Sequence, residues 1–302
     1  MRNVLREWQA EVRRTLTGSP SAPPEWAEKF AQGNDPGFYL PGSAVWAVHH
    51  GMPTIVAGIR SLLMQTLHPG VMAGVYEHSK FHEDSLGRLA RTTRWIHAVT
   101  YGSTADARTA TDSVLRIHDT VRGQYVDGTG ATRDYSANDP DLLRWVHVTF
   151  TDSFLTAHKK WGGPIPGGPD AYVREWAQAA RLMGVSSPPL REVELTRELN
   201  DWFAAGALRA DERVAETVAF IRNPPLHPWL LPGYRVLFAG AVLSLEPRYR
   251  EMLGLRTARL GPLPLPVGLA TRVTLAVVRL ALGRMGPSEL AARQRLRRLG
   301  VA

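Results

Sequence analysis

The chain has 302 residues, with 36 Lys and Arg against 28 Asp and Glu and no cysteine. A chain of this length can bury a sizeable core without crosslinks, and an ordinary charged fraction of 21% excludes wholesale disorder. The absence of cysteine excludes disulfides, cysteine-ligated zinc and iron–sulfur sites, and thiolate-ligated haem, so a metal or cofactor must be held by His, carboxylate, Tyr or Met.

The excess positive charge lies at the C-terminal end. Residues 252–302 contain nine arginines and one acid, Glu289, whereas residues 1–251 contain equal numbers of basic and acidic side chains. The net charge of +8 therefore indicates a basic tail rather than a nucleic-acid-binding body.

The first half of the chain predicts helices interrupted by irregular segments. Residues 1–17 place apolar side chains at helical spacing among charges, which predicts an amphipathic helix rather than a signal peptide. The Pro- and Gly-rich residues 18–42 predict an irregular lead-in. Apolar periodicity then predicts helices over 54–67 and 71–78, separated at His68 because the following proline disfavours helical backbone there.

Capping residues mark where the next helices begin. Asp84 and Ser85 predict the start of a helix that ends near residue 100. Ser103 with Asp106 approximates a capping box, and the helix that it opens is expected to end at Gly123.

The second half of the chain also predicts helices. Asp139 followed by Pro140 predicts a helix that ends near residue 160. Periodicity predicts further helices over 171–183, 190–208, 211–221 and 233–245. No segment shows strand-like alternation of useful length, so we expect no strands and an all-α fold.

We expect one large helical domain at residues 37–250, preceded by residues 1–36 and followed by a basic C-terminal extension at 251–302. The apolar stretches 53–77 and 263–283 are interrupted by charged or polar residues, so neither predicts a membrane-spanning helix. These observations lead us to expect a cytoplasmic protein.

His118 is the first candidate for chemistry. It lies four residues after Val114 and three before Val121, along the apolar stripe of the helix that begins near residue 103. A buried histidine there is most often a core residue that bonds a carbonyl group. The alternative is a metal or haem ligand, because a neutral imidazole nitrogen in an apolar cavity suits iron.

Two other histidines compete with His118. His147 follows Leu143 by four residues on the apolar face of its helix. His68 stands at a helix break, where a capping role and a ligand role are equally open. The remaining histidines form no zinc motif and are expected at the surface or behind the site.

Arg88, Arg91, Thr92 and Trp95 share one helix face at positions i, i+3, i+4 and i+7. A solvated face is the usual meaning of two arginines on a helix, but the large aromatic ring in the same row favours partial burial. Around a cavity, two guanidinium groups and a hydroxyl would supply hydrogen-bond donors for an anion, a carboxylate or bound oxygen.

Six segments in combination resemble the MpaB-like oxygenases, a family that includes the rubber oxygenases or latex-clearing proteins. The resemblance covers about residues 37–245. The segments are Gly42–Trp46, Leu63–Pro69, Gly74–Phe81, Gly87–Thr92, Arg116–His118 and Asp139–His147.

The resemblance implies an all-α oxygenase that binds haem b and cleaves C=C bonds of isoprenoid chains with dioxygen. It implies that His118 is the proximal iron ligand and that Arg88, Arg91 and Thr92 line the distal side. Arg91 stands where the family has lysine, and since guanidinium coordinates iron poorly, we expect an open or water-bound distal site. His147, His68 and Trp95 are then expected to pack beside the haem.

Three functions therefore compete. The first is a haem-dependent oxygenase acting on a hydrophobic, unsaturated small molecule, the second a haem carrier or sensor without turnover, and the third a helical membrane-surface or partner-binding module with structural histidines. The segment Leu263–Leu282, followed by the basic cluster Arg293–Arg298, predicts either contact with an anionic membrane or a docked C-terminal helix with a solvated basic end.

Overall fold

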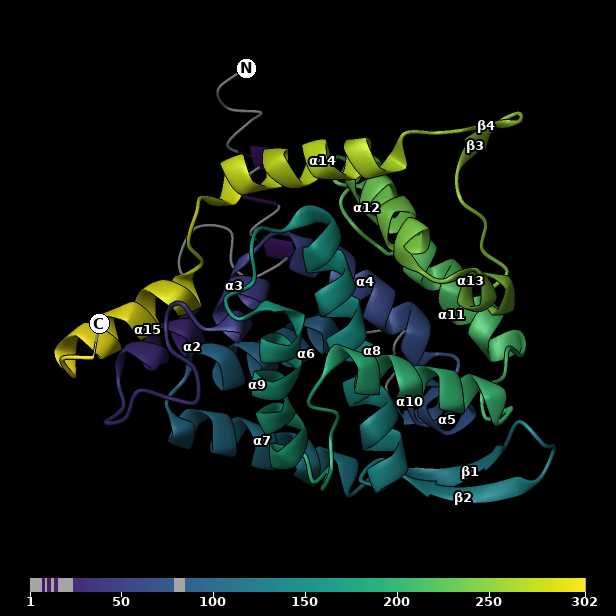
Figure 1. Cartoon of the computed structure of the whole chain (residues 1–302), viewed down its shortest axis with the longest axis horizontal. Helices are drawn as coiled ribbons and strands as arrows, with labels where there is room; N and C mark the ends of the chain where they lie inside the picture. Colours follow the sequence, from purple (N-terminus) through teal and green to yellow (C-terminus); the bar gives the residue numbers. More distant parts are fainter. Residues whose placement is uncertain (1–6, 9, 12–13, 16–23, 79–84, 302) are drawn as a thin grey trace.

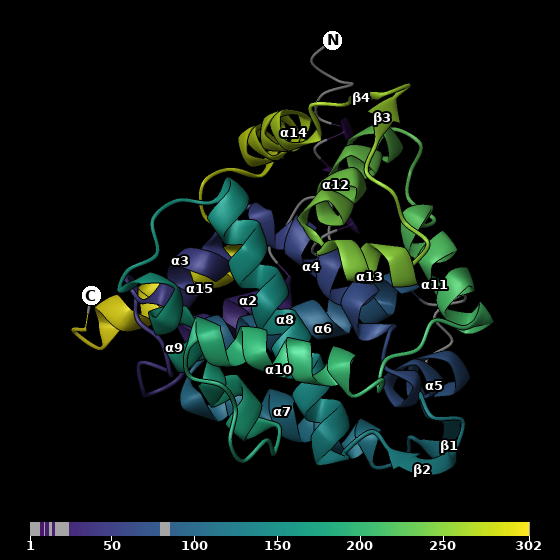
Figure 2. The same ribbon diagram turned by 45° about the vertical axis from the view of Figure 1, so that its right-hand side comes forward.

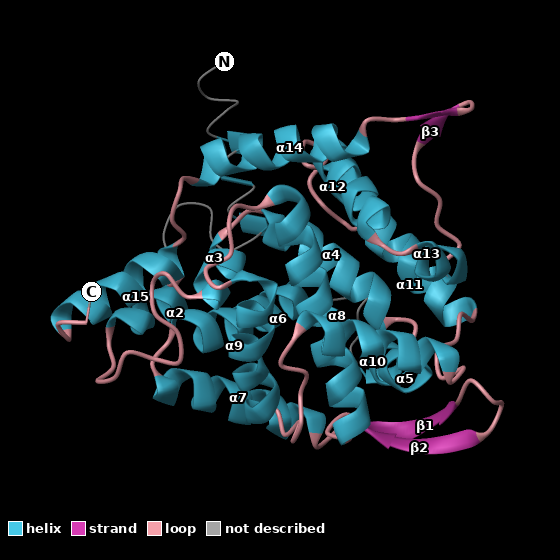
Figure 3. Ribbon diagram, viewed as in Figure 1, coloured by secondary structure: helices cyan, strands magenta, loops and turns pink. Residues whose placement is uncertain are grey.

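A computed structural model shows a helical protein, and it describes residues 7–8, 10–11, 14–15, 24–78 and 85–301 (Figures 1 and 3). The strands in this part of the chain form two small hairpins, and every longer element is a helix. The expectation of an all-α fold is confirmed.

The core lies around two long central helices, α4 (Pro53–Gln65) and α8 (Pro140–Trp161), which pack against each other. The other helices surround this pair: α2 (Glu25–Glu28), the 3-10 turn η1 (Lys29–Ala31), α3 (Ala44–His50), α5 (Pro69–His78), α6 (Ser85–Tyr101), α7 (Thr104–His118), α9 (Gly168–Leu182), α10 (Glu192–Ala204), α11 (Glu212–Arg222), α12 (Leu231–Ser244), α13 (Pro247–Met252), α14 (Val267–Leu282) and α15 (Pro287–Arg298). On one side α12 packs on α4 and α14 packs on α12, while on another α6 pairs with α7.

Two of the predicted helix starts are confirmed by their hydrogen bonds. The backbone N–H of Asp106 donates to Ser103 Oγ at 3.1 Å, and the N–H of Ser103 donates back to Asp106 Oδ2 at 2.9 Å, which completes a capping box. Asp139 Oδ1 accepts from the N–H of Asp141 at 3.0 Å, and Pro140 occupies the first position of α8. The third predicted cap, Asp84, lies outside the described residues.

The expectations of no strands and of a helix reaching Gly123 were wrong. Helix α7 ends at His118, and the chain continues into β1 (Arg122–Val126), which pairs antiparallel with β2 (Thr132–Ser136). The turn between them is held by Asp127 Oδ1, which accepts from the N–H groups of Thr129 and Ala131 at 2.9 and 3.0 Å. A second, two-residue hairpin joins β3 (Arg259–Leu260) to β4 (Leu263–Pro264).

The predicted N-terminal helix over 1–17 lies mostly outside the described residues, although residues 7–8, 10–11 and 14–15 are helical. The expected irregular lead-in contains α2 and η1 in its described part. Among the helices that the structure describes, none has the length and the apolar character needed to span a membrane.

The basic C-terminal helix α15 docks on the domain against η1 and α2. Arg295 is buried, and its guanidinium donates to the carbonyl groups of Phe30 at 2.7 Å and Tyr101 at 2.9 Å. Glu289, also buried, forms an ion pair with Arg293 at 2.8 Å, and its other carboxylate oxygen lies within hydrogen-bond distance of His50 Nδ1 at 2.5 Å. Of the two possibilities for the cluster Arg293–Arg298, the structure therefore has the docked helix, with Arg297 and Arg298 exposed.

Several histidines are buried in the core. His49 is enclosed by the rings of Phe154, Tyr172 and Trp176, and its two nitrogens lie 2.9 Å from Thr100 Oγ1 and 3.1 Å from Tyr172 Oη. Burial lowers the pKa of His49 to about 3, of His68 to about 4 and of His147 to about 3.

These lowered pKa values predict that stability falls in mild acid. Below about pH 6.5 these histidines bind protons in the unfolded chain but not in the folded protein. Each of them therefore lowers the free energy of unfolding by about 2 kcal/mol between pH 7 and pH 5. Urea unfolding at the two pH values measures the loss. The variant H147Q removes one of these three histidines and should therefore reduce the loss by about 2 kcal/mol, leaving the contributions of His49 and His68. Equal unfolding midpoints for the native protein at pH 7 and pH 5 would contradict this prediction.

Candidate active site between helices α6 and α7

Helices α6 and α7 form an antiparallel pair joined by a tight turn at Gly102 and Ser103. One hydrogen bond fixes their register. Trp95 lies eight residues before Ser103 and Thr111 eight residues after it, and Trp95 Nε1 donates to Thr111 Oγ1 at 3.1 Å. Residues equally distant from Ser103 therefore lie at the same level of the pair.

Arg88 and His118 obey the same rule, since each lies fifteen residues from Ser103. Each is also seven residues, or about two helical turns, beyond Trp95 or Thr111, so it shares the face that its helix turns toward the other. The charge of Arg88 contributes to lowering the pKa of His118, after the larger effect of burial. The helix pair thus brings an arginine and a histidine together at its open end.

The ring of His118 keeps one polar atom available in the interior. Its Nδ1 is buried and has no hydrogen-bond partner among the described residues, and the Oδ1 of Asn138 is in the same situation. The Asn138 side chain lies next to this turn of α7, because its Nδ2 donates to the carbonyl of Leu115 at 3.2 Å and to Asp119 Oδ1 at 2.7 Å. The nearby Asn138 side chain raises the pKa of His118, against the larger lowering by burial. His118 is therefore a neutral imidazole at pH 7, beside an amide oxygen that can accept a hydrogen bond from its ring N–H.

The four residues of the arginine stripe have different surroundings. Arg88 is half-buried, and burial followed by the charge of Arg91 lowers the pKa of its guanidinium. Arg91 and Thr92 are exposed, and Thr92 Oγ1 donates to the carbonyl of Arg88 at 3.2 Å. Trp95 is half-buried between α7 and α9, where its ring meets Trp176 edge-on at 6.2 Å. Trp95 thus fastens helices together, and Arg88 is the member of the stripe that lies at the level of His118.

His147 and His68 contact other parts of the fold. His147 lies on α8, where the Thr151 hydroxyl is 3.4 Å from its Nε2 and donates to its carbonyl at 2.7 Å. The charges of Arg144 and Arg181 add to burial in lowering the pKa of His147. These contacts indicate a packing role in this structure.

His68 has a capping role. Its Nδ1 accepts from the N–H of Gly70 at 3.2 Å at the start of α5, and its ring is enclosed by Tyr125, Trp145 and Trp202. Of the two roles that the sequence left open, the hydrogen bond supports the capping one.

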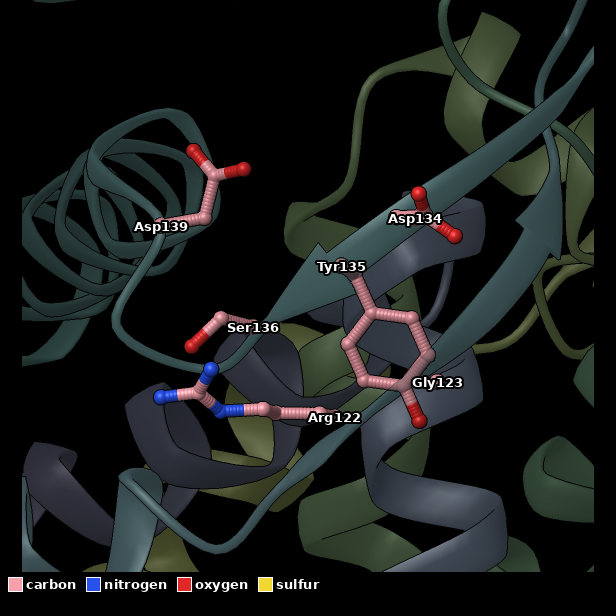
Figure 4. Close-up of a pocket in the computed structure, with 6 residues that line it drawn as sticks. All are labelled: Arg122, Gly123, Asp134, Tyr135, Ser136 and Asp139. Carbon is pink, nitrogen blue, oxygen red and sulfur yellow. The ribbon is translucent and has the colours of Figure 1, made fainter.

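A solvent-open pocket lies just beyond the end of α7, between the hairpin and the start of α8. Figure 4 shows its lining residues, Arg122, Gly123, Asp134, Tyr135, Ser136 and Asp139. The guanidinium of Arg122 donates to the carbonyl of Asp119, next to His118 in the chain. Both the pocket and Asn138 depend on the hairpin that the sequence analysis missed, although the Asp127–Gly130 turn residues were a signal for it.

The arrangement at the open end of the α6–α7 pair suits one kind of chemistry. A neutral imidazole can ligate a metal ion whose other ligands come from nearby residues or from a porphyrin ring. The guanidinium on the facing helix can donate hydrogen bonds to an oxygen atom. No three histidine or carboxylate side chains within the described ranges cluster in a way that could hold a metal ion.

Comparison with known proteins identifies the family. The family described as "ER-bound oxygenase mpaB/B'/Rubber oxygenase, catalytic domain" matches residues 46–280, a range that includes α6, α7 and Asn138. No curated protein and no solved structure matches the chain. The expected resemblance is therefore confirmed, and the chain belongs to the mpaB and rubber oxygenase family of oxygenase catalytic domains.

Proposed function

We propose that this protein is a haem b-dependent oxygenase that acts on a hydrophobic, unsaturated, isoprenoid-like small molecule and cleaves its C=C bond with dioxygen. The family supports an oxygenase with a small-molecule substrate. The observation that carries the haem proposal is the placement of His118, a half-buried neutral imidazole with a buried Nδ1 that lies at the level of Arg88 across the α6–α7 pair.

The residues on the two helices fit a haem. An axial histidine must be neutral, and the Nδ1–H that does not bind iron needs an acceptor. Burial keeps His118 neutral at pH 7, and the unsatisfied Oδ1 of Asn138 is an acceptor of the required kind. With Nδ1–H donated to Asn138, the Nε2 of His118 carries the lone pair that would hold iron.

A bound haem would supply the iron centre that activates dioxygen toward an electron-rich double bond. Arg88 would provide a guanidinium donor where negative charge develops on oxygen during the reaction. A donor that is already in place loses little energy to reorganisation, so its effect on the transition state is large. A guanidinium is a poor iron ligand, so Arg91 would act as a hydrogen-bond donor and not as a ligand.

The packing of Trp95 determines from which end of the helix pair substrate and water would reach the site. The Trp95–Thr111 bond and the Trp95–Trp176 contact close the inner end of the helix pair, so that Arg88 and His118 lie at its outer end. A hydrophobic substrate would approach from there and displace water, which strengthens the hydrogen bonds that Arg88 donates.

The absorption spectrum of the purified protein tests the haem proposal, and oxygen consumption with a prenyl alkene tests the activity. A Soret band together with oxygen uptake supports the oxygenase. A Soret band without uptake would favour a carrier or sensor, and the lack of any haem after reconstitution would favour a binding module with structural histidines. Membrane contact by the C-terminal segment is a separate proposal, because it rests on other residues.

The first variant concerns the ligand. H118A removes the only nitrogen proposed to hold iron, so the Soret band should disappear while the far-UV circular dichroism stays close to that of the native protein. H147A and H68A should keep haem, because His147 and His68 contact other parts of the fold. If H118A retains full haem and H147A loses it, the assignment of the ligand is wrong.

A second variant tests how His118 is positioned. N138L removes the acceptor for Nδ1–H, and loss of such a partner typically weakens metal binding by about 10–100-fold. Haem affinity measured by transfer to apomyoglobin should fall by a factor in that range. N138D keeps an oxygen acceptor at the same place and should lose less. Equal affinities for the native protein and N138L would show that Asn138 does not orient the ligand.

The third set of variants tests the distal donors. R88A should keep haem but lose about 10²–10³ in turnover, the usual cost of removing one preorganised donor. T92A should fall in the same direction, because the Thr92 hydroxyl bonds the carbonyl of Arg88. R94A, which removes an exposed arginine from the same helix, is the matched control and should change turnover little. Native turnover in both R88A and T92A would mean that the stripe is a solvated helix face.

A further inference from the structure

Helix α14 is apolar on two faces, and its partner α12 covers one of them. The residues that face α12 are buried: Val267, Thr271, Leu275, Val278 and Ala281. The two helices approach closely at Gly240, where a Cβ would lie 2.5 Å from Thr271 Oγ1. The other face carries Leu269, Val273, Val277 and Leu280, all exposed, with Leu280 at 84%. Exposed apolar side chains beside basic ones on a helix, as with Arg272 and Arg279 here, are typical of a helix that lies in a membrane interface.

The β3–β4 hairpin continues this exposed apolar face. Leu260 is 72% exposed and Leu263 68% exposed, and Leu265 in the link to α14 is exposed as well. Figures 1 and 2 show the hairpin and α14 along the same edge of the molecule in both views. A hairpin and a helix therefore both present exposed leucine side chains along one edge, and exposed apolar side chains gathered in this way indicate an interaction site.

The charged side chains in this stretch of the chain are all of one sign. Residues 252–288 contain Arg256, Arg259, Arg272, Arg279 and Arg284 and no acidic residue. All five arginines are exposed. A second copy of the chain on this face would bring like charges together, which disfavours a symmetric dimer. An anionic lipid surface complements both the leucines and the arginines.

A pocket opens on the same face. It is lined by Lys160, Trp161, Leu243, Gly268, Leu269 and Arg272. The Arg272 guanidinium donates to the carbonyl of Lys160 at 3.3 Å, and Trp161 Nε1 donates to the carbonyl of Gly268 at 3.1 Å. Two cationic side chains at the rim of an apolar pocket match a phosphate group above an acyl chain, and tryptophan is a typical side chain at the level of lipid headgroups.

We propose that α14 and the β3–β4 hairpin dock the protein on an anionic phospholipid membrane, with Lys160 and Arg272 at the headgroup phosphates and the exposed leucines and valines in the acyl boundary. The chain lies on the membrane surface in this arrangement and does not cross it. The proposal depends neither on haem nor on turnover, so it can be tested separately from the proposed oxygenase activity.

Flotation of the full-length protein with vesicles tests the docking. One set of vesicles contains phosphatidylcholine alone and the other phosphatidylcholine mixed with phosphatidylglycerol. We expect the protein to float with the mixed vesicles, to remain unbound with the neutral ones, and to be released by high salt. Equal binding to both sets, or binding to neither, overturns the proposal.

Two pairs of variants locate the surface. V273E places a charge in the acyl boundary and should lower binding by about tenfold or more. V193E on α10 is its control, because Val193 is 54% exposed and Val273 56%. The double variant R272Q/R279Q should lower binding about 30-fold, since each basic residue near the surface contributes about 1 kcal/mol.

The charge-matched control for R272Q/R279Q is R108Q/R174Q, which removes two exposed arginines from α7 and α9 and should bind as the native protein does. Equal losses in the test and control variants would overturn the assigned surface. Size-exclusion chromatography without vesicles adds a further check. If V273E converts a native dimer to a monomer, this face is a subunit interface and the membrane proposal is wrong.

Discussion

The turn between α6 and α7 is the constraint on which the candidate site depends. Two long helices meet there across Gly102 and Ser103, and the site lies at their far ends, where a small change of angle at the turn becomes a large displacement. Over fifteen residues each helix extends about 22 Å from the turn. A Cβ at Gly102 would lie 2.5 Å from the Ala98 carbonyl oxygen, so the turn admits glycine and little else.

Segments far apart in the chain hold this turn in place. Asp35 accepts hydrogen bonds from the N–H of Thr104 at 2.8 Å and from its hydroxyl at 3.0 Å, which fixes the first turn of α7 from the lead-in segment. The buried Arg295 of α15 donates to Tyr101 at the last turn of α6. A buried guanidinium needs several acceptors, and the carbonyl groups of Phe30 and Tyr101 supply them. The C-terminal helix therefore belongs to the scaffold that orients Arg88 toward His118, even though it lies outside the residues that the family matches.

The sequence predicts those elements whose signals are local. The caps at Ser103 and Asp139 and the apolar periodicity of α4 and α8 fix helix starts and faces without reference to the rest of the chain. The equal spacing of Arg88 and His118 about Ser103 is also legible in the sequence, once the two helices are known to be antiparallel.

The β1–β2 hairpin and the docking of α15 depend on more distant contacts. The hairpin follows helix α7 directly, and its first strand is polar and contains glycine. Because this strand shows no alternation of apolar and polar residues, periodicity alone predicted that the helix continues to Gly123. Arg295 is indistinguishable in sequence from its exposed neighbours Arg297 and Arg298, because its burial depends on carbonyl groups supplied by residues near 30 and 101. Asn138 could not be predicted as a site residue from the sequence, because the role of its oxygen atom depends on its position beside His118 in the folded chain.

The hydrogen-bond partners of the histidine rings distinguish His118 from the other candidates. Both ring nitrogens of His49 lie against hydroxyl groups, His68 uses Nδ1 to cap α5, and His158 has its Nε2 at the carbonyl of Gly163. Burial lowers the pKa of each of them, so a lowered pKa alone does not distinguish a ligand from a packed ring. His118 combines partial burial with an unsatisfied Nδ1, an unsatisfied amide oxygen nearby and a guanidinium on the facing helix. The Nδ1 of His158 is also buried without a partner, but its Nε2 already lies at a carbonyl group. Since a metal-bound imidazole needs one nitrogen for the metal and an acceptor for the other, the combination at His118 favours it over the other histidines.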